Sequence, residues 1–127
     1  MRIGEASKRT GLSYHALRYY ENIGLIRNLV RDDKGNRKYT DDDIKWIKFL
    51  LSLRNTGMPL NEIIYYAELY YSGDDSIPKR IKLLSNYKDR LAEEVKKQQN
   101  SIEFLANKIE FYINKLNMIN PNQKNCL

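Results

Sequence analysis

The chain has 127 residues, one cysteine and a formal net charge of +6. This length predicts one small domain, or a small domain with an extension, and a lone cysteine excludes a disulfide framework within the chain. The N-terminus lacks the apolar run of a signal peptide, and no stretch approaches the roughly 20 apolar residues that span a bilayer. We therefore expect a cytoplasmic protein with no membrane partner.

The positive charge is concentrated in the first half of the chain. Residues 1–58 hold 12 Lys+Arg and 7 Asp+Glu, whereas residues 59–127 hold 10 and 9. Neutralisation of phosphates by basic side chains drives nonspecific affinity for nucleic acids. The asymmetry therefore favours a polyanionic partner for the first half, whereas a role in solubility alone would not require it.

Two short helices are predicted at the start of the chain. Residues 3–10 form the first, Gly11 and Leu12 make a turn, and Ser13 is a suitable N-cap for a second helix that stops near Gly24. At roughly 100° per residue, the apolar side of this second helix comprises Ala16, Leu17, Tyr20 and Ile23. The opposite side comprises Tyr14, His15, Arg18, Tyr19 and Asn22. This pattern is typical of a helix-turn-helix whose polar face contacts base edges and phosphates, and the alternative is an ordinary helix pair with a solvated face.

A small β-hairpin is predicted next, because residues 32–35 have turn chemistry and are flanked by short runs that can pair. Its basic residues are Arg27, Arg31, Lys34, Arg37 and Lys38. Such a wing would lie on the phosphate backbone, and the alternative is a solvated loop.

Thr40 then caps a helix that begins with three aspartates, whose charges complement the helix dipole. A metal site is not expected from them, because adjacent helical residues point in different directions. A further helix follows over residues 60–71, with an apolar side made of Leu60, Ile63, Ile64, Ala67 and Tyr70. Its tyrosines, Tyr65, Tyr66, Tyr70 and Tyr71, indicate aromatic packing, with a ligand pocket as the alternative.

A long helix over residues 77–119 carries apolar residues in alternating steps of four and three, which is the heptad seam of a coiled coil. The predicted dimerisation residues are Ile81, Leu84, Leu91, Val95, Ile102, Leu105, Ile109, Tyr112 and Leu116, with Lys88 and Gln98 as polar interruptions. A chain of this size cannot bury such a seam by itself, so we expect a homodimer. Residues 72–76 form a linker, and residues 120–127 are expected to be a flexible tail.

A set of motifs carries a family resemblance, namely Ile3-Gly4-Glu5-Ala6, Thr10-Gly11-Leu12-Ser13, Leu17-Arg18-Tyr19-Tyr20-Glu21, Gly24-Leu25-Ile26, Arg37-Lys38-Tyr39, Asp43-Ile44 and Leu53-Arg54-Asn55-Thr56-Gly57-Met58. With them, essentially the whole chain resembles MerR-family transcription regulators. The resemblance implies a mainly α-helical protein, with a winged helix-turn-helix DNA-binding domain over residues 1–71 and an antiparallel coiled coil after it. The implied DNA-binding residues are Ser13, Tyr14, His15, Arg18, Tyr19, Arg37, Lys38, Tyr39, Arg54, Thr56 and Met58.

The resemblance also implies a mechanism. The homodimer would bind a pseudo-palindromic operator in the spacer of double-stranded promoter DNA and would bend and untwist it for RNA polymerase. The free energy needed to deform the DNA would then form part of the regulatory switch. The alternative is an architectural protein that bends DNA without activating transcription. An enzyme is not expected, because the chain has one His, one Cys and no Gly-rich phosphate loop.

No cofactor or metal is predicted, and any small-molecule effector is left unidentified. Arg54 to Pro59, with Ala67 to Tyr70, resembles the short aldehyde- and electrophile-stress branch. Ser52 stands where the thiol-sensing members of that branch have a cysteine, and Cys126 lies in a polar tail with no neighbouring histidine. A serine hydroxyl is a far weaker nucleophile than a thiolate, so direct covalent sensing is not expected.

Overall fold

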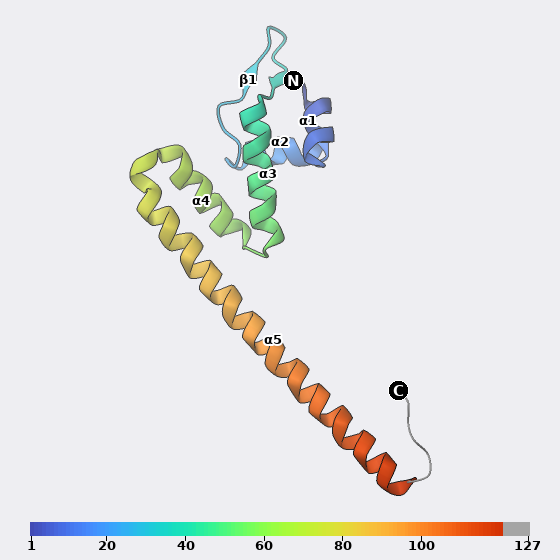
Figure 1. The fold of residues 1–127 in the computed structure, drawn as a ribbon. Helices are drawn as coiled ribbons and strands as arrows, with labels where there is room; N and C mark the ends of the chain where they lie inside the picture. Colours follow the sequence, from blue (N-terminus) through green and yellow to red (C-terminus); the bar gives the residue numbers. More distant parts are fainter. Residues whose placement is uncertain (121–127) are drawn as a thin grey trace. The chain divides into compact units, whose positions relative to one another are not determined.

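The computed structural model describes residues 1–120, and the chain divides into two compact units, residues 1–85 and the part from Asn86 onward. Its elements, shown in Figure 1, are α1 (Ile3–Thr10), α2 (Tyr14–Asn22), β1 (Val30–Arg31), β2 (Arg37–Lys38), α3 (Asp41–Asn55), α4 (Leu60–Ser72), the 3-10 turn η1 (Asp74–Ser76) and α5 (Ile77–Ile119). The prediction of a mainly helical fold with a small hairpin and a long C-terminal helix is confirmed. Most of the predicted tail, with Cys126, lies outside the described residues.

Local sequence signals start and stop the first helices. The Ser13 hydroxyl accepts a 3.0 Å hydrogen bond from the Ala16 N–H, which confirms it as the N-cap of α2. Gly11 ends α1 with a φ of 76°, a conformation in which a Cβ would be strained. α1 packs against both α2 and α3, so the helix-turn-helix is held against a third helix.

β1 and β2 form a two-stranded antiparallel hairpin in which Val30 faces Lys38 and Arg31 faces Arg37. Asp32 organises the turn, because its Oδ1 accepts hydrogen bonds from the Asn36 N–H at 2.9 Å and the Lys34 N–H at 3.0 Å. The backbone bond from Asn36 is the main cause that holds the pKa of the Asp32 carboxyl below its usual range. The predicted hairpin is confirmed.

α3 provides the centre of the first unit. Thr40 and Asp43 form a reciprocal capping box at its start, in agreement with the predicted cap. Its side chains Ile44, Ile47, Leu50 and Leu53 are buried. Trp46 on the same helix stacks on Tyr70 with a 4.1 Å centroid distance, and it also contacts the rings of Phe49, Tyr66 and Tyr71. The Trp46 indole N–H donates a 2.8 Å hydrogen bond to the Leu25 carbonyl, and so ties α3 to the segment that follows α2.

The predicted apolar side of α4 is partly wrong. The structure buries Ile63, Tyr66, Ala67 and Leu69 and leaves Leu60 and Tyr70 each 43% exposed. The stacking of Tyr66 on Trp46 and Phe49 turns that ring inward, which helical spacing alone does not reveal. Tyr66, Tyr70 and Tyr71 all pack on Trp46, as the packing interpretation of these tyrosines expects.

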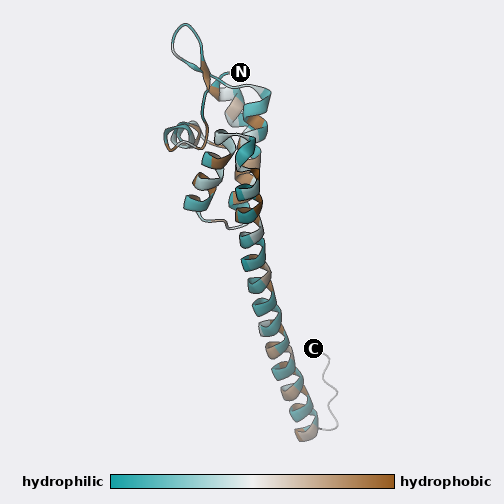
Figure 2. Ribbon diagram, turned by 90° about the vertical axis from the view of Figure 1, so that its left-hand side faces the viewer, coloured by the Kyte–Doolittle hydropathy of each residue, from teal (hydrophilic) through white to brown (hydrophobic). Residues whose placement is uncertain are grey.

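α5 has no buried residue along its length. Figure 2 shows hydrophobic residues recurring along this helix among hydrophilic ones. The exposed apolar residues include Val95 and Ile102 of the predicted seam, and they extend to Phe104, Phe111 and Met118 outside it. Among residues 1–120, no helix has the length and apolar character that crossing a membrane requires.

Candidate nucleic-acid interface

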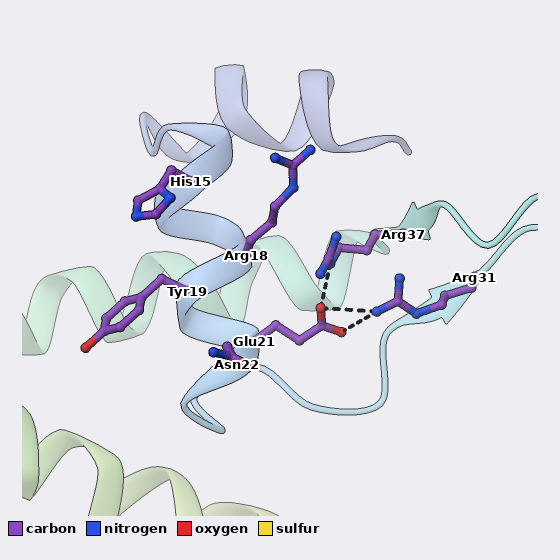
Figure 3. Close-up of a pocket in the computed structure, with 7 residues that line it drawn as sticks. All are labelled: His15, Arg18, Tyr19, Glu21, Asn22, Arg31 and Arg37. Atoms are coloured by element: carbon purple, nitrogen blue, oxygen red, sulfur yellow. Dashed lines mark hydrogen bonds and ion pairs between the residues drawn. The ribbon is translucent and has the colours of Figure 1, made fainter.

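α2 presents its polar face to solvent, as its sequence predicts. Leu17 and Tyr20 are buried, whereas Tyr14 and Tyr19 are 49% and 44% exposed and His15 and Arg18 are also exposed. Figure 3 shows His15 and Tyr19 projecting from one side of this helix and Arg18 from the side nearer to Arg37. Within the described residues, no hydrogen bond or ion pair engages the Arg18 guanidinium, so it is available to a ligand.

Tyr14 lies against the preceding helix. A Cβ added to Gly4 would come within 2.9 Å of the Tyr14 hydroxyl oxygen, so a side chain at position 4 would displace this ring. The ring thus sits over α1 with about half of its surface open to solvent. Gly4 therefore allows Tyr14 to lie on the exposed face beside His15.

Tyr20 anchors the opposite side of α2. It is 5% exposed, and its hydroxyl accepts a 2.8 Å hydrogen bond from Arg54 Nη1 on α3. Arg54, predicted to contact phosphate, therefore has one guanidinium nitrogen directed at Tyr20 while the residue as a whole stays exposed. Thr56 is also exposed, and its hydroxyl donates to the Leu53 carbonyl at 2.6 Å.

The wing arginines are engaged by a residue of α2. Arg37 Nε lies 2.5 Å and Arg31 Nη2 lies 3.3 Å from Oε1 of Glu21 (Figure 3). The two arginines and α2 line a groove of about 510 Å³. Its lining residues are His15, Arg18, Tyr19, Glu21, Asn22, Arg31 and Arg37. Contact of Arg37 with DNA stays a prediction, and in the structure its guanidinium is paired with Glu21 and only a quarter exposed.

The remaining basic residues of this region differ in their surroundings. Arg27 lies over the Tyr71 ring at 5.1 Å, and its backbone N–H donates a 3.1 Å hydrogen bond to the Tyr71 hydroxyl. Burial raises the pKa of that Tyr71 phenol. Lys34 and Lys38 are exposed on the hairpin. The lysines therefore stay at the surface of the wing, and Arg27 joins the wing to α4.

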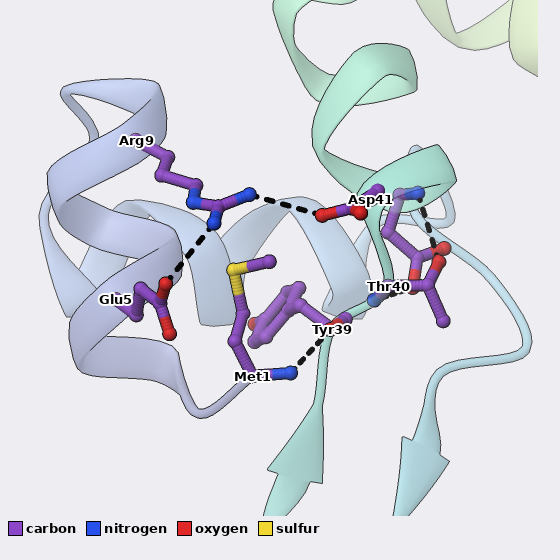
Figure 4. Close-up of polar contacts among 7 residues, drawn as sticks. Met1, Glu5, Arg9, Tyr39, Thr40 and Asp41 are labelled. Atoms are coloured by element: carbon purple, nitrogen blue, oxygen red, sulfur yellow. Dashed lines mark hydrogen bonds and ion pairs between the residues drawn. The ribbon is translucent and has the colours of Figure 1, made fainter.

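Two predicted DNA-binding residues are buried. Tyr39 is 1% exposed, its hydroxyl has no hydrogen-bond partner among the described residues, and burial raises its pKa. The Met1 amine donates a 2.6 Å hydrogen bond to the Tyr39 carbonyl, which ties the N-terminus to the end of β2 (Figure 4). Met58 is 4% exposed. Neither side chain can reach a duplex, because each fills the core beneath the surface, and only the backbone near Met58 remains a candidate.

Sequence reasoning missed Glu21 as a partner of the wing. The predicted turn did not give the register, because a turn centred between residues 33 and 34 would pair Arg31 with Asn36, whereas the structure pairs Arg31 with Arg37. Two like charges placed opposite each other on a strand pair are destabilising unless a third group compensates them. Only the observed register shows that these two charges need a compensating carboxylate, and Glu21 supplies it.

A helix-turn-helix with a basic wing and an exposed polar recognition face defines a protein of the DNA-binding class. The family model of the MerR HTH family regulatory proteins matches residues 1–69, and the chain belongs to this family. In the part that the structure describes, no group of three or more His, Cys, Asp or Glu side chains could hold a metal ion.

Relatives of the chain are named as regulators. It is 36% identical over 108 residues to an HTH-type transcriptional regulator of Haemophilus influenzae, covering 85% of this chain and 80% of the relative. It is 40% identical over 93 residues to the HTH-type transcriptional regulator AdhR of Bacillus subtilis, covering 73% of this chain and 66% of that protein.

The fold is also similar to a solved complex. The structure of HiNmlR, a MerR family regulator lacking the sensor domain, bound to promoter DNA, has a TM-score of 0.72 and 35% identity, and the match covers 87% of this chain and 88% of that one. The family, the relatives and this structure together identify the chain as a transcriptional regulator that binds DNA.

Proposed function

We propose that the chain acts as a homodimer on a pseudo-palindromic operator within the spacer of a promoter, and that it controls transcription by bending and untwisting the DNA for RNA polymerase. The observation that supports this most directly is the exposed face of α2, with a free Arg18 beside Tyr19 and His15. The promoter complex of HiNmlR, at 35% identity, supports promoter DNA as the ligand.

Within this proposal, α2 enters the major groove and Arg18 contacts base edges, because a guanidinium can bond guanine through two acceptors. Tyr19, His15 and Tyr14 flank it and contact the groove wall or the backbone. Lys38, Arg54 and Thr56 meet phosphates, which position the domain without reading the sequence.

The proposal of a homodimer rests on α5. Ile81, Val95, Ile102, Leu105 and Ile109 are each between 57% and 64% exposed, although they follow a heptad pattern. A second copy of this helix would cover them and would hold two α2 helices on two half-sites, which matches a pseudo-palindromic operator. Residues 1–71 then form the DNA-binding domain, residues 72–76 the linker and residues 77–119 the dimerisation helix.

The proposed place of action is the cytoplasm, with no enzymatic step. The resemblance of Arg54 to Pro59, with Ala67 to Tyr70, to the aldehyde- and electrophile-stress branch supports a role in a stress response. A covalent sensor at position 52 is not part of the proposal, because the Ser52 hydroxyl donates to the Lys48 carbonyl within the same helix and is not a thiol.

The test replaces Arg18 with alanine and measures binding to a duplex that the parent protein has enriched from a random-sequence pool. Loss of a base contact should weaken binding by about 1–3 kcal/mol in a titrated gel shift. Lys97→Ala, which removes the same charge from exposed α5, is the matched control and should bind as the parent does.

Unchanged affinity of Arg18→Ala would contradict the assignment of α2 as the recognition helix. Transcription from a promoter with an overlong spacer separates the two mechanisms. A regulator of this proposal activates it, whereas an architectural protein only bends the DNA.

A further inference from the structure

The inference concerns Glu21 and rests on the proposed function. Arg31 and Arg37 are direct cross-strand partners in the hairpin, so their positive charges stand side by side. Glu21, on α2, places its carboxylate between them (Figure 3). Oε1 accepts from Arg37 Nε at 2.5 Å and from Arg31 Nη2 at 3.3 Å, and Oε2 accepts from the same Arg31 nitrogen at 3.4 Å.

Glu21 is the only acid among the residues that line the groove between α2 and the wing. A carboxylate on a DNA-facing surface repels phosphates and so weakens DNA binding. Its presence on this surface therefore calls for a compensating role. Its side chain is only 20% exposed, and it engages two guanidinium groups at once. The negative charge of Glu21 is therefore directed at the two wing arginines and is little exposed to solvent.

The cations of this surface thus fall into two classes. Arg31 and Arg37 are paired with Glu21, whereas no hydrogen bond or ion pair within residues 1–120 engages Arg18 or the ammonium of Lys38. Nonspecific affinity for DNA grows with the number of phosphates that basic side chains neutralise. Only the unpaired class is fully available for that purpose.

We propose that Glu21 is a positioning residue that sets the specificity of DNA binding. It engages both guanidinium groups and offsets one of their two positive charges when the protein meets an arbitrary sequence, and it fixes the orientation of the wing relative to α2 for the operator. Nonspecific binding is thereby kept weak while the fit to the operator is retained, which raises the ratio of specific to nonspecific affinity. That ratio, not affinity alone, decides whether a regulator finds its site among competing DNA.

The experiment compares the parent with Glu21→Gln on two duplexes by fluorescence anisotropy over a series of KCl concentrations. One duplex is enriched from a random-sequence pool by the parent, and the other is its scrambled counterpart. Glutamine keeps the size of the side chain and removes the charge. On the scrambled duplex, the slope of log K against log salt should become steeper by about one to two, and affinity at low salt should rise about tenfold. The preference for the enriched duplex should fall.

Asp41→Asn is the matched control, because it also removes one negative charge that pairs with an arginine. Asp41 forms a 2.9 Å ion pair with Arg9, a residue of α1. Arg9 also pairs with Glu5 at 3.2 Å, and this second ion pair remains when Asp41 is replaced. This variant should leave the salt slope as in the parent. An equal steepening in both variants, or none in Glu21→Gln, would overturn the proposal, because a general effect of net charge or a purely structural role would then suffice.

A second pair of variants leaves Glu21 in place and covers the case in which Glu21→Gln does not fold. Lys38→Gln should reduce the salt slope on the scrambled duplex by about one. Arg31→Gln should reduce it by clearly less, because Glu21 already engages that guanidinium. Equal reductions would refute the masking of the wing arginines.

The two proposals fail in different ways. If the pool yields no enriched duplex, the proposed function fails, whereas the slopes on the scrambled duplex still decide whether Glu21 masks the arginines. If the parent prefers the enriched duplex and Glu21→Gln keeps the same preference and slope, the proposed function stands and this inference falls.

Discussion

Residues 1–85 and the part of α5 beyond Asn86 contrast in how they use apolar side chains. Within the described chain, every buried hydrophobic residue lies between Ala6 and Leu69, so the first unit has a core of its own. α5 is the longest helix, and none of its residues is buried. Helix length and burial therefore do not go together in this chain. The short helix α1, of eight residues, packs against two other helices, whereas the long helix α5 buries no residue.

The two regions therefore depend on different sources of stability. Removing apolar surface from water contributes roughly 25 cal/mol per Å². The first unit obtains this contribution within one chain, whereas α5 can obtain it only from a second surface. The proposed homodimer supplies that surface, and the following variants break or sharpen the contrast, in order of decreasing effect.

The largest effect is expected from a charge in the seam of α5. Leu91→Asp or Ile102→Asp should abolish self-association and reduce helicity, because a carboxylate would have to lose its hydration at the interface. Sedimentation equilibrium and far-UV circular dichroism measure both changes. Asn100→Asp, on the outer face of the predicted heptad, should leave them unaltered. A parent protein that sediments as a folded monomer would remove the argument for a dimer.

The next effect concerns the core of the first unit. Leu17 is fully buried, so Leu17→Ala should lower the free energy of unfolding by about 2–5 kcal/mol. Trp46 is the only tryptophan, and its fluorescence during urea titration reports this unit. Leu105→Ala, the same substitution on exposed α5, should shift the Trp46 transition much less. Equal shifts would mean that the two units unfold as one.

A smaller effect is expected from a single hydroxyl. Tyr20→Phe removes the acceptor of the 2.8 Å hydrogen bond from Arg54, which should cost about 0.5–1.5 kcal/mol of stability. Tyr19→Phe is the natural comparison, because Tyr19 is exposed and its hydroxyl makes no hydrogen bond within the described residues. Thermal unfolding should therefore separate the two variants, and coincident curves would show that the Arg54 bond contributes nothing.

The smallest effect concerns the wing at acid pH. Backbone hydrogen bonds lower the pKa of Asp32 in the folded protein, so its contribution is present above its unfolded pKa and is lost as pH falls through the folded pKa. The Lys34 and Asn36 amides should then exchange faster with solvent. Amide exchange measured by NMR at decreasing pH tests this, and Asp32→Asn should remove the pH dependence. A pH-independent wing in the parent would contradict the role of the carboxylate.

The sequence by itself determined the local structure of this protein. Ser13 and Thr40 cap their helices, residues 32–35 turn a hairpin, and the 3.6-residue period assigns Leu17 and Arg18 to opposite sides of α2. These features depend on residues a few positions apart, whose geometry is set by the backbone. The motifs of the family, such as Leu17 to Glu21, are of the same local kind, which is why the family could be recognised from them.

Only the tertiary structure decided which side chains of the candidate interface are free. Tyr39 is polar and stands beside the basic hairpin, yet it is buried. Tyr66 is buried against Trp46, although helical spacing alone did not assign it to the apolar side of α4. Glu21 and Arg37 are 16 residues apart, and they meet because the fold brings the Glu21 side chain of α2 within hydrogen-bond distance of the hairpin. Such contacts depend on how separate elements approach one another, and no local period of the sequence encodes that approach.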